Sequence, residues 1–426
     1  GAAEVLRMAD GGCLDDGDGL NNQNSCPIAG HEFAGADFDY LAANVVDDAT
    51  GDTLLPGVSI KELDGVKIGF IGMTLEGTPS IVTPAGVAGL SFKDEVATAN
   101  KLVPSLVRQG VRSIVVLLHE GGFPSGGYNE CPGISGPIVD IAANLSPQID
   151  AVITGHTHQA YNCTLPDPDG QPRLVTSASS LGRIITDINL KINTRSHDVV
   201  RSSSSAVNRI VTRDVAKDPE ITSLMNQYGA IIAPIANAVV GSTAEPITRP
   251  NAPQTPMGQV IADAQLAATR AAEDGGAQLA LMNPGGVRAE LDAGDVTYGE
   301  AFAVQPFANA LTTVTLTGAQ LKAVLEQQRS NLILQPSTGF RFTFTASAPA
   351  GARVSDITLG GAPIDPAASY RVTANNFLTT GGDGFTAFLA GTDIKNGVID
   401  LDALTKYIHD NSPLHVPADF PRVTIG

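Results

Sequence analysis

The sequence has few basic residues and lacks the long apolar runs that cross membranes. Its 26 lysines and arginines stand against 44 aspartates and glutamates, which gives a net charge of −18. No Lys/Arg-rich run is visible, so the composition argues against a nucleic-acid partner and requires local cations to hold any phosphate. No stretch of about 18 apolar residues occurs, which argues against a membrane-spanning helix. The first residues also lack the pattern of a signal peptide.

The length of 426 residues allows two domains with large cores. Strand and helix patterns alternate in the first half, which predicts an α/β fold. A long helical pattern at residues 218–239 contains Pro234, which we expect to kink or interrupt the helix. We take residues 216–240 as the connection between a first domain, residues 1–215, and a second domain, residues 241–426.

The tetrapeptide Gly155-His156-Thr157-His158 is the most informative motif for chemistry. It directly follows the apolar run at residues 149–154, and a strand ending there delivers both imidazoles to the carboxyl edge of a sheet, where open α/β sheets bind ligands. Imidazole suits zinc, iron, copper and nickel, and tolerates manganese. Incidental surface histidines also form His-x-His pairs, so the motif alone leaves both interpretations open.

A third histidine has the same setting. Residues 111–118 predict a strand buried on both faces, because the apolar residues run without alternation, and His119 and Glu120 follow at its end. The alternative is a histidine whose hydrogen bonds are satisfied within the fold. We expect His119, His156 and His158 to lie together at one sheet edge, with their ring nitrogens facing a shared cavity.

The four cysteines lie in loop-like contexts rich in Gly, Asn and Pro. Their spacing does not suggest a Cys-x-x-Cys metal site, and an even count in loops suits two disulfides and an oxidising compartment. Cys131 and Cys163 flank the histidine loops, so we predict one bridge between them and a second between Cys13 and Cys26.

The second half contains further motifs at the ends of predicted elements. A short buried strand at residues 277–282 ends in Asn283-Pro284-Gly285-Gly286-Val287-Arg288. Thr317 is placed to cap a helix, and alternating phenylalanines at residues 339–345 predict a half-buried strand. Residues 376–385 form a Gly-rich segment with two aromatic residues and one carboxylate.

Together these motifs resemble the metallophosphatase/5′-nucleotidase family of secreted and periplasmic phosphoesterases, over essentially the whole chain. The resemblance implies an N-terminal calcineurin-like metallophosphoesterase sandwich, incomplete here, and a C-terminal α/β domain that grips the nucleoside, with a hinge rotation between them. It also implies a secreted, periplasmic or cell-surface protein. The supporting segments are Tyr40-Leu41-Ala42-Ala43-Asn44-Val45, Leu118-His119-Glu120, Gly155-His156-Thr157-His158, Asn283 to Arg288, Val304-Gln305-Pro306-Phe307 and Asn376 to Phe385.

The resemblance assigns roles to matching residues. His119 and His156 resemble ligands of one divalent metal ion and His158 a ligand of a second, with zinc or manganese as candidates.

In the C-terminal domain, Asn283 and Arg288 resemble the polar pair that holds base or phosphate. Phe307 and Phe377 resemble the aromatic clamp around the base, and Asp383 resembles the carboxylate that binds the ribose hydroxyls. Without the resemblance, Phe307 would be a core aromatic and the Asp383 loop a plain tight turn.

The sequence departs from the family at its beginning. An Asp-x-His, a Gly-Asp whose Asp bridges the metals and an Asn-His-Glu/Asp are not found, so we expect the catalytic histidine upstream of residue 1 and infer that an N-terminal segment is missing. His31-Glu32 imitates the last motif but lacks its Asn, and it lies in a segment that varies in the family. Arg249 matches loosely as a second phosphate-binding arginine.

The resemblance predicts a metal-dependent phosphomonoester hydrolase of nucleotide catabolism, a 5′-nucleotidase with a possible 2′,3′-cyclic phosphodiesterase activity. Without a bridging carboxylate, three histidines should bind metal weakly, so we expect this chain to bind adenosine or AMP and to hydrolyse AMP negligibly. Two alternatives stay open. One is a non-catalytic nucleotide-binding protein with a degenerate metal site, and the other is a related sulfur-ester hydrolase on the same scaffold.

Overall fold

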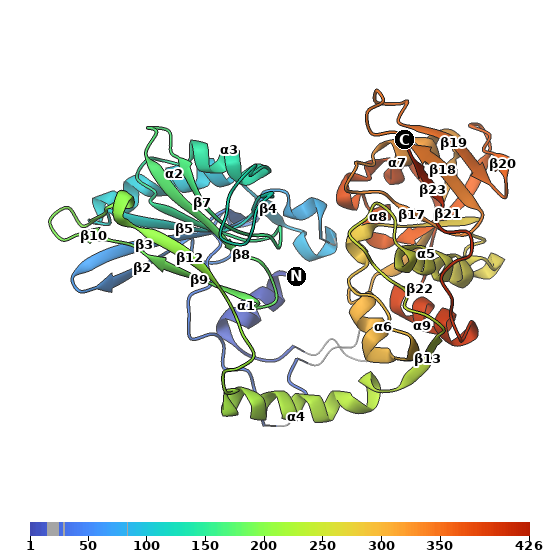
Figure 1. Ribbon diagram of the computed structural model, residues 1–426, viewed down its shortest axis with the longest axis horizontal. Coiled ribbons are helices and arrows are strands. Elements are labelled where there is room, and N and C mark those ends of the chain that lie inside the picture. Colours follow the sequence, from blue (N-terminus) through green and yellow to red (C-terminus); the bar gives the residue numbers. More distant parts are fainter. Residues whose placement is uncertain (15–24, 29, 83) are drawn as a thin grey trace. The chain divides into compact units, whose positions relative to one another are not determined.

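The computed structural model describes residues 1–426 except 15–24, 29 and 83. The described residues form two compact units (Figure 1). The first unit holds most of the chain up to Asp218, and the second holds Pro219–Gly426 with short stretches near residues 26 and 82. Each unit has a hydrophobic core of its own.

A six-stranded sheet in the order β2-β3-β5-β6-β8-β7 is the framework of the first unit. Its central strands are parallel and consist of β3 (Val66–Thr74), β5 (Ser113–His119), β6 (Ala151–Thr154) and β8 (Pro172–Ala178). Its antiparallel edge strands are β2 (Val58–Leu63) and β7 (Ala160–Pro166). The parallel strands are largely buried, in agreement with their continuous apolar runs.

Helices α2 (Glu95–Arg108) and α3 (Pro137–Asn144) pack against one face of this sheet through a shared apolar cluster (Figure 1). The opposite face carries a smaller hydrophobic cluster.

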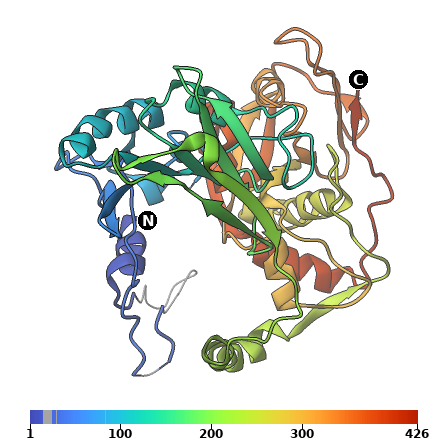
Figure 2. The ribbon, with the colours of Figure 1, turned by 60° about the vertical axis from the view of Figure 1, so that its left-hand side comes forward.

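A separate antiparallel pair is formed by β9 (Ile184–Asn189) and β12 (Ser205–Ile210), which are drawn in green in Figure 2. The remaining helix and strands of this unit are α1 (Ala2–Asp10), β1 (Val45–Asp47), β4 (Leu90–Phe92), β10 (Ile192–Asn193) and β11 (Asp198–Val199).

The second unit contains a five-stranded sheet in the order β17-β14-β21-β16-β22. Its strands are β17 (Gln335–Pro336), β14 (Leu279–Met282), β21 (Ser369–Asn375), β16 (Ala310–Thr317) and β22 (Thr392–Ile399). Strands β14 and β21 are parallel neighbours, and the other pairs are antiparallel.

Helices and a second sheet surround the five-stranded sheet. One core cluster joins it to α7 (Gly318–Glu326) and to a four-stranded sheet, and another cluster joins three further helices. Those helices are α5 (Pro256–Thr269), α6 (Tyr298–Val304) and α9 (Asp400–Asp410). The four-stranded sheet consists of β20 (Ala362–Pro363), β19 (Val354–Leu359), β18 (Phe340–Phe344) and β23 (Val423–Ile425). The remaining elements are α4 (Pro219–Ala236), β13 (Val239–Thr243), β15 (Gly294–Thr297) and α8 (Asn376–Thr379).

Local sequence signals account for several of these elements. The phenylalanines of β18 are buried and Arg341 between them is exposed, which confirms the alternating strand. Thr317 caps α7 as predicted, and its hydroxyl accepts the Gln320 N–H at 3.2 Å. The expected interruption at Pro234 is wrong, because α4 continues through it to Ala236. Pro234 lacks the N–H that would donate to the Ala230 carbonyl, and the helix ends two residues later.

Both predicted disulfides are present. Cys131 and Cys163 are bonded, with a Cα–Cα distance of 5.1 Å. Cys13 and Cys26 are also disulfide-bonded, and since no free cysteine remains they pair with each other. A search of the described helices finds none with the length and apolar character needed to cross a bilayer.

Arg173 is a fully buried cation that organises the amino-terminal side of the first sheet. Its guanidinium donates to the backbone carbonyls of Ile149 (2.8 Å), Ala142 (2.5 Å), Leu145 (3.3 Å) and Ser146 (2.6 Å). These carbonyls lie at the end of α3 and before β6, where the partial negative charge of a helix C-terminus favours a cation. Burial lowers the pKa of Arg173 to about 10, so it stays charged at neutral pH.

We predict that Arg173→Lys lowers the free energy of unfolding by about 3 kcal/mol, because one ammonium cannot satisfy four buried carbonyls in different directions. Urea unfolding followed by circular dichroism measures this change. Arg209→Lys is the matched control, since Arg209 forms an exposed pair with Asp187 and should change stability by no more than about 0.5 kcal/mol. Equal effects of the two substitutions would contradict the prediction.

Asp400 anchors the segment that carries Phe307. It is 1% exposed at the start of α9, and its carboxylate accepts hydrogen bonds from the Asn309 amide (3.3 Å), the Gln305 amide (3.5 Å) and the Leu401 N–H (2.9 Å). Burial is the first cause that raises the pKa of Asp400, to about 6, although the hydrogen bonds from Asn309 and Leu401 act against it. The folded state therefore holds this proton at pH values where the unfolded chain has lost it.

We predict that Asp400→Asn removes a decline in the free energy of unfolding, on the order of 3 kcal/mol, between about pH 4 and about pH 6. The sign follows from the raised pKa: in that window the folded state binds more protons, so stability falls as pH rises. Urea titrations at four pH values from 4 to 7 test this. Asp402→Asn changes an exposed carboxyl in the same helical turn and should keep the wild-type profile. The prediction is wrong if Asp400→Asn keeps it too.

Candidate functional sites of the two units

The predicted histidine site lies where two neighbouring parallel strands end. In the register of β5 and β6, Leu118 is opposite Thr154, so His119 and Gly155 leave the sheet side by side. The rings of His119 and His156 lie edge to face, with centroids 5.4 Å apart. The expected placement at one sheet edge is confirmed. The hollow that His119 lines, of about 350 Å³, is formed with Thr154 and Gly155 and does not include the other two imidazoles.

The loops after β5 and β6 pack closely against each other. A Cβ atom on Gly121 would lie 2.4 Å from the Gly155 carbonyl oxygen, and one on Gly155 would lie 3.2 Å from His119 Nδ1. His156 and His158 have φ values of 64° and 56°, in the left-handed region that side chains other than glycine seldom adopt. Such backbone persists where the surroundings impose it, and it gathers at functional sites.

The electrostatics of the pair favour neutral imidazoles. Burial of the ring is the first cause that lowers the pKa of His119, although the residue as a whole stays accessible, and the charge of His156 is the second. Burial and then the charge of His158 lower the pKa of His156. Neutral rings offer the lone pair that a metal ion requires.

These residues fit only part of a metal centre. His119 and His156 offer two imidazoles, but among the described residues no group of three ligand side chains that includes them brings its ligand atoms within 4.8 Å of one another. A pair of cations needs a bridging carboxylate to offset their repulsion. The described residues therefore do not complete the two-metal centre that the resemblance implies, and no reaction step is assigned to it.

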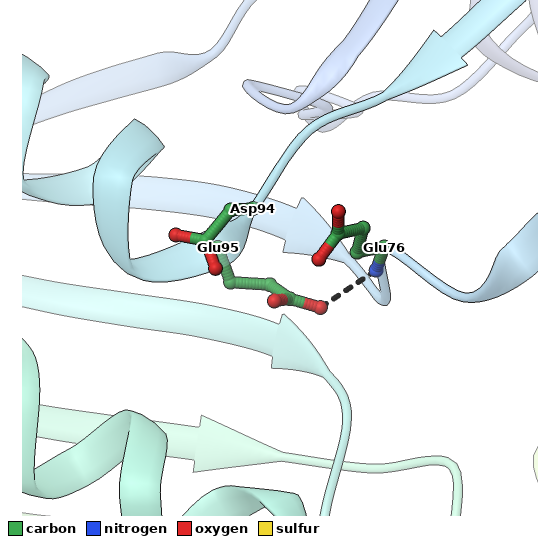
Figure 3. Close-up of side chains that lie close together, drawn as sticks. All are labelled: Glu76, Asp94 and Glu95. Atoms are coloured by element: carbon green, nitrogen blue, oxygen red, sulfur yellow. Dashed lines mark hydrogen bonds between the residues drawn. The ribbon is translucent and has the colours of Figure 1, made fainter.

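A cluster of carboxylates that the sequence analysis missed lies beside this edge. Glu76, Asp94 and Glu95 have carboxylate oxygens within 4.8 Å of one another (Figure 3). Asp94 caps α2 by accepting the Ala97 N–H at 2.6 Å, and Glu95 accepts the Glu76 N–H at 2.6 Å. Acidic side chains at the start of a helix are favoured by its dipole, so local structure accounts for the cluster.

The second unit brings three of the predicted substrate-binding residues together. Asn283 follows β14, and Phe377 and Asp383 follow the adjacent parallel strand β21. The Asn283 amide donates to Asp383 Oδ2 at 2.8 Å. A Cβ atom on Gly382 would lie 2.6 Å from the Phe377 ring, so the loop folds back on that ring. Burial is the first cause that raises the pKa of Asp383, against the Asn283 hydrogen bond and the charge of Arg329.

The remaining predicted residues form an aromatic and cationic group. The Arg288 guanidinium lies 5.7 Å from the Phe307 ring centroid. Phe307 is 53% exposed, which rejects the alternative of a core aromatic. Partial burial and then the positive charge of Arg288 lower the pKa of Arg249, whereas the charge of Glu290 acts against them. Arg288 Nη1 also donates to the Gly285 carbonyl at 3.3 Å, and Gly285 adjoins Asn283 and Asp383.

Sequence analysis missed two residues that contact this site. Arg329 donates to the Asp383 carbonyl at 3.0 Å. Asn375, at the end of β21, donates to Asn283 Oδ1 at 3.0 Å. Neither residue belongs to a motif that the sequence analysis used, and only the position of Asn375 before a short helical segment was a visible signal.

Similarity to known proteins agrees with this geometry. Residues 236–390 match the 5′-nucleotidase, C-terminal domain. Endonuclease YhcR of Bacillus subtilis is 29% identical over 96% of this chain and 32% of its own length. Cell wall protein Lmo0130 of Listeria monocytogenes is 30% identical over 92% of this chain and 53% of its own length. The chain thus spans between about a third and about half of these curated relatives.

A solved structure, the 5′-nucleotidase precursor from Thermus thermophilus, superposes with a TM-score of 0.77 at 25% identity, over 91% of this chain and 78% of that one. The matched 91% of this chain includes parts of both units. Residues 236–390 thus carry a 5′-nucleotidase C-terminal domain, and the chain as a whole is similar to proteins of the metallophosphatase/5′-nucleotidase family.

Proposed function

We propose that this protein is a metal-dependent 5′-nucleotidase, which hydrolyses phosphoester bonds of nucleotides when a complete set of metal ligands is in place, and that the described residues supply the nucleotide site and part of the metal site. The second unit holds the nucleotide, and the first unit, corresponding to the metallophosphoesterase domain predicted at residues 1–215, supplies imidazole ligands for divalent metal ions. The observation that carries the proposal is the group formed by Arg288 over the exposed Phe307 ring and by Gly285, whose carbonyl accepts from Arg288 and which adjoins Asn283 and Asp383. That group lies within the stretch that matches the 5′-nucleotidase C-terminal domain.

Two arginines supply the local positive charge that an acidic protein needs to bind a phosphate. A net charge of −18 repels anions at long range. Arg249 and Arg288 concentrate positive charge locally, and each guanidinium is a planar fork that matches phosphate oxygens. Burial and then the charge of Arg288 lower the pKa of Arg249, and a bound anion, like Glu290, would act in the opposite direction.

The aromatic and acidic groups suit the nucleoside. Phe307 presents an exposed ring face and Phe377 a partly buried one, and both can stack on a base. Asp383 Oδ2 is already bonded to Asn283, which holds the carboxylate as an acceptor for a ribose hydroxyl. A charge-assisted hydrogen bond of this kind is stronger than a neutral one.

Divalent metal ions, when bound, would activate water and stabilise charge on the phosphoryl oxygens. The contribution of this chain is to hold His119 and His156 neutral and close together. Two disulfides and the relative described as a cell wall protein support a secreted, periplasmic or cell-surface location.

The incomplete metal centre favours one second candidate, a nucleotide-binding protein without hydrolytic activity. The relative described as an endonuclease raises the question of a nucleic-acid substrate. The charge of −18 favours a small nucleotide instead.

We predict that Phe307→Ala weakens adenosine binding by about tenfold, because stacking of a base on an aromatic ring contributes roughly 1–3 kcal/mol. Isothermal calorimetry on the whole chain measures the affinity. Phe302→Ala is the matched control: Phe302 is 48% exposed in the same unit but lies on α6, before the Gln305–Asn309 segment. A wild-type chain that does not bind adenosine at millimolar concentrations would refute the proposed function.

We also predict that the 426-residue chain binds zinc through His119 and His156. We expect it to release phosphate from AMP far more slowly than a typical enzyme, whose turnover rate is about 1 per second or more. His156→Ala should weaken zinc binding about tenfold in equilibrium dialysis, whereas His409→Ala, a change at an exposed histidine, should not. Metal-dependent phosphate release at an enzymic rate would show that the ligand set is complete after all.

A further inference from the structure

We propose that Asn375 is the positioning residue of the nucleoside site, fixing Phe377 and the Asp383 carboxylate together through one buried amide. The inference rests on the proposed function, because it concerns how that site is arranged. Asn375 itself is 1% exposed and contacts protein groups, so its role is to orient other side chains.

The Asn375 amide makes hydrogen bonds in opposite directions, and its Nδ2 also donates to Met282 Sδ at 3.6 Å. Its Oδ1 accepts the Leu378 N–H at 2.9 Å, which caps α8, the short helix that carries Phe377. Its Nδ2 donates to Asn283 Oδ1 at 3.0 Å. The side chain therefore joins the helix that bears the aromatic ring to the strand end that bears Asn283.

A backbone group sets the direction of this hydrogen-bond chain. The Leu378 N–H can only donate, so the Asn375 oxygen must face it and the Asn375 nitrogen must face Asn283. Asn283 then has its oxygen engaged, and its nitrogen donates to Asp383 Oδ2 at 2.8 Å. Because Asn375 and Asn283 are buried, reversing either amide would leave donors or acceptors unsatisfied.

The consequence is a carboxylate held as an acceptor with one oxygen free. Asp383 Oδ2 is engaged by Asn283, and no described residue donates to Oδ1. Asp383 sits at φ 55° in a glycine-rich turn, a backbone conformation that requires support from its surroundings. The chain of amides supplies this support and leaves Oδ1 available for a ribose hydroxyl.

The substitution Asn375→Asp separates the two roles of the amide. A carboxylate still caps α8, since Asp is as good an N-cap as Asn, but it has no donor for Asn283. The Asn283 amide must then turn towards the new carboxylate, which points its oxygen at Asp383 and breaks the hydrogen bond there. Asn375→Ser achieves the same separation without a buried charge, because a serine hydroxyl can cap the helix but does not reach Asn283.

The test compares binding of adenosine and of 2′,3′-dideoxyadenosine, which lacks the ribose hydroxyls, by calorimetry on the whole chain. Wild type should prefer adenosine. Asn375→Asp and Asn375→Ser should weaken adenosine binding by about tenfold and change binding of the dideoxy compound by less than about threefold. Asn411→Asp makes the same chemical change at an exposed residue of the same unit and should alter neither affinity.

The outcomes are distinguishable. Equal weakening of both ligands by the folded serine variant would reduce Asn375 to a structural residue and overturn the inference. Unchanged selectivity in both variants would overturn it as well, while leaving the proposed function intact. Failure of the wild-type chain to bind adenosine would instead remove the proposed function, and the inference with it.

Discussion

Parallel pairing of neighbouring strands is the constraint on which both sites depend. In the first unit, β5 and β6 end side by side and place His119 next to the loop that bears His156. In the second unit, β14 and β21 do the same for Asn283 and Asn375. Since parallel neighbours end at the same edge, residues that are far apart in sequence meet there without any special loop structure. The rest of each site is built on that edge.

Close packing of the loops turns this proximity into fixed geometry. Gly121 and Gly155 allow the loops after β5 and β6 to touch, and Gly382 allows the second-unit loop to fold over Phe377. Buried polar groups then determine which way each side chain faces, because an unsatisfied donor or acceptor in such a place costs about 1–3 kcal/mol. At the opposite edge of the first sheet, the buried Arg173 guanidinium fixes the backbone in the same way, because it donates hydrogen bonds to four carbonyls.

What the sequence could predict follows from how local each signal is. The strand ending at His119, the phenylalanine alternation of β18 and the cap at Thr317 depend on neighbours a few residues away, and they were predicted. The bond between Asn375 and Asn283 joins residues 92 positions apart and has no local pattern. The Arg173 cluster is of the same kind, and the Glu76 cluster likewise assembles only in the fold. Pro234 was misjudged, because the helix continues through it for two residues despite the missing N–H donor.

The candidate sites of the two units differ in charge. The first consists of neutral imidazoles, and the second contains charged side chains. The first unit removes charge from its histidines, since desolvation and mutual repulsion lower their pKa values and leave lone pairs for a cation. The second unit gathers charge, with Arg288 over the Phe307 ring and a carboxylate at Asp383 aligned by neutral amides. In a protein with a net charge of −18, only such short-range arrangements can hold a phosphate. Under the proposed function, selectivity for a nucleotide has to come from the fixed positions of a few side chains, and the role proposed for Asn375 is to fix two of those positions through buried hydrogen bonds.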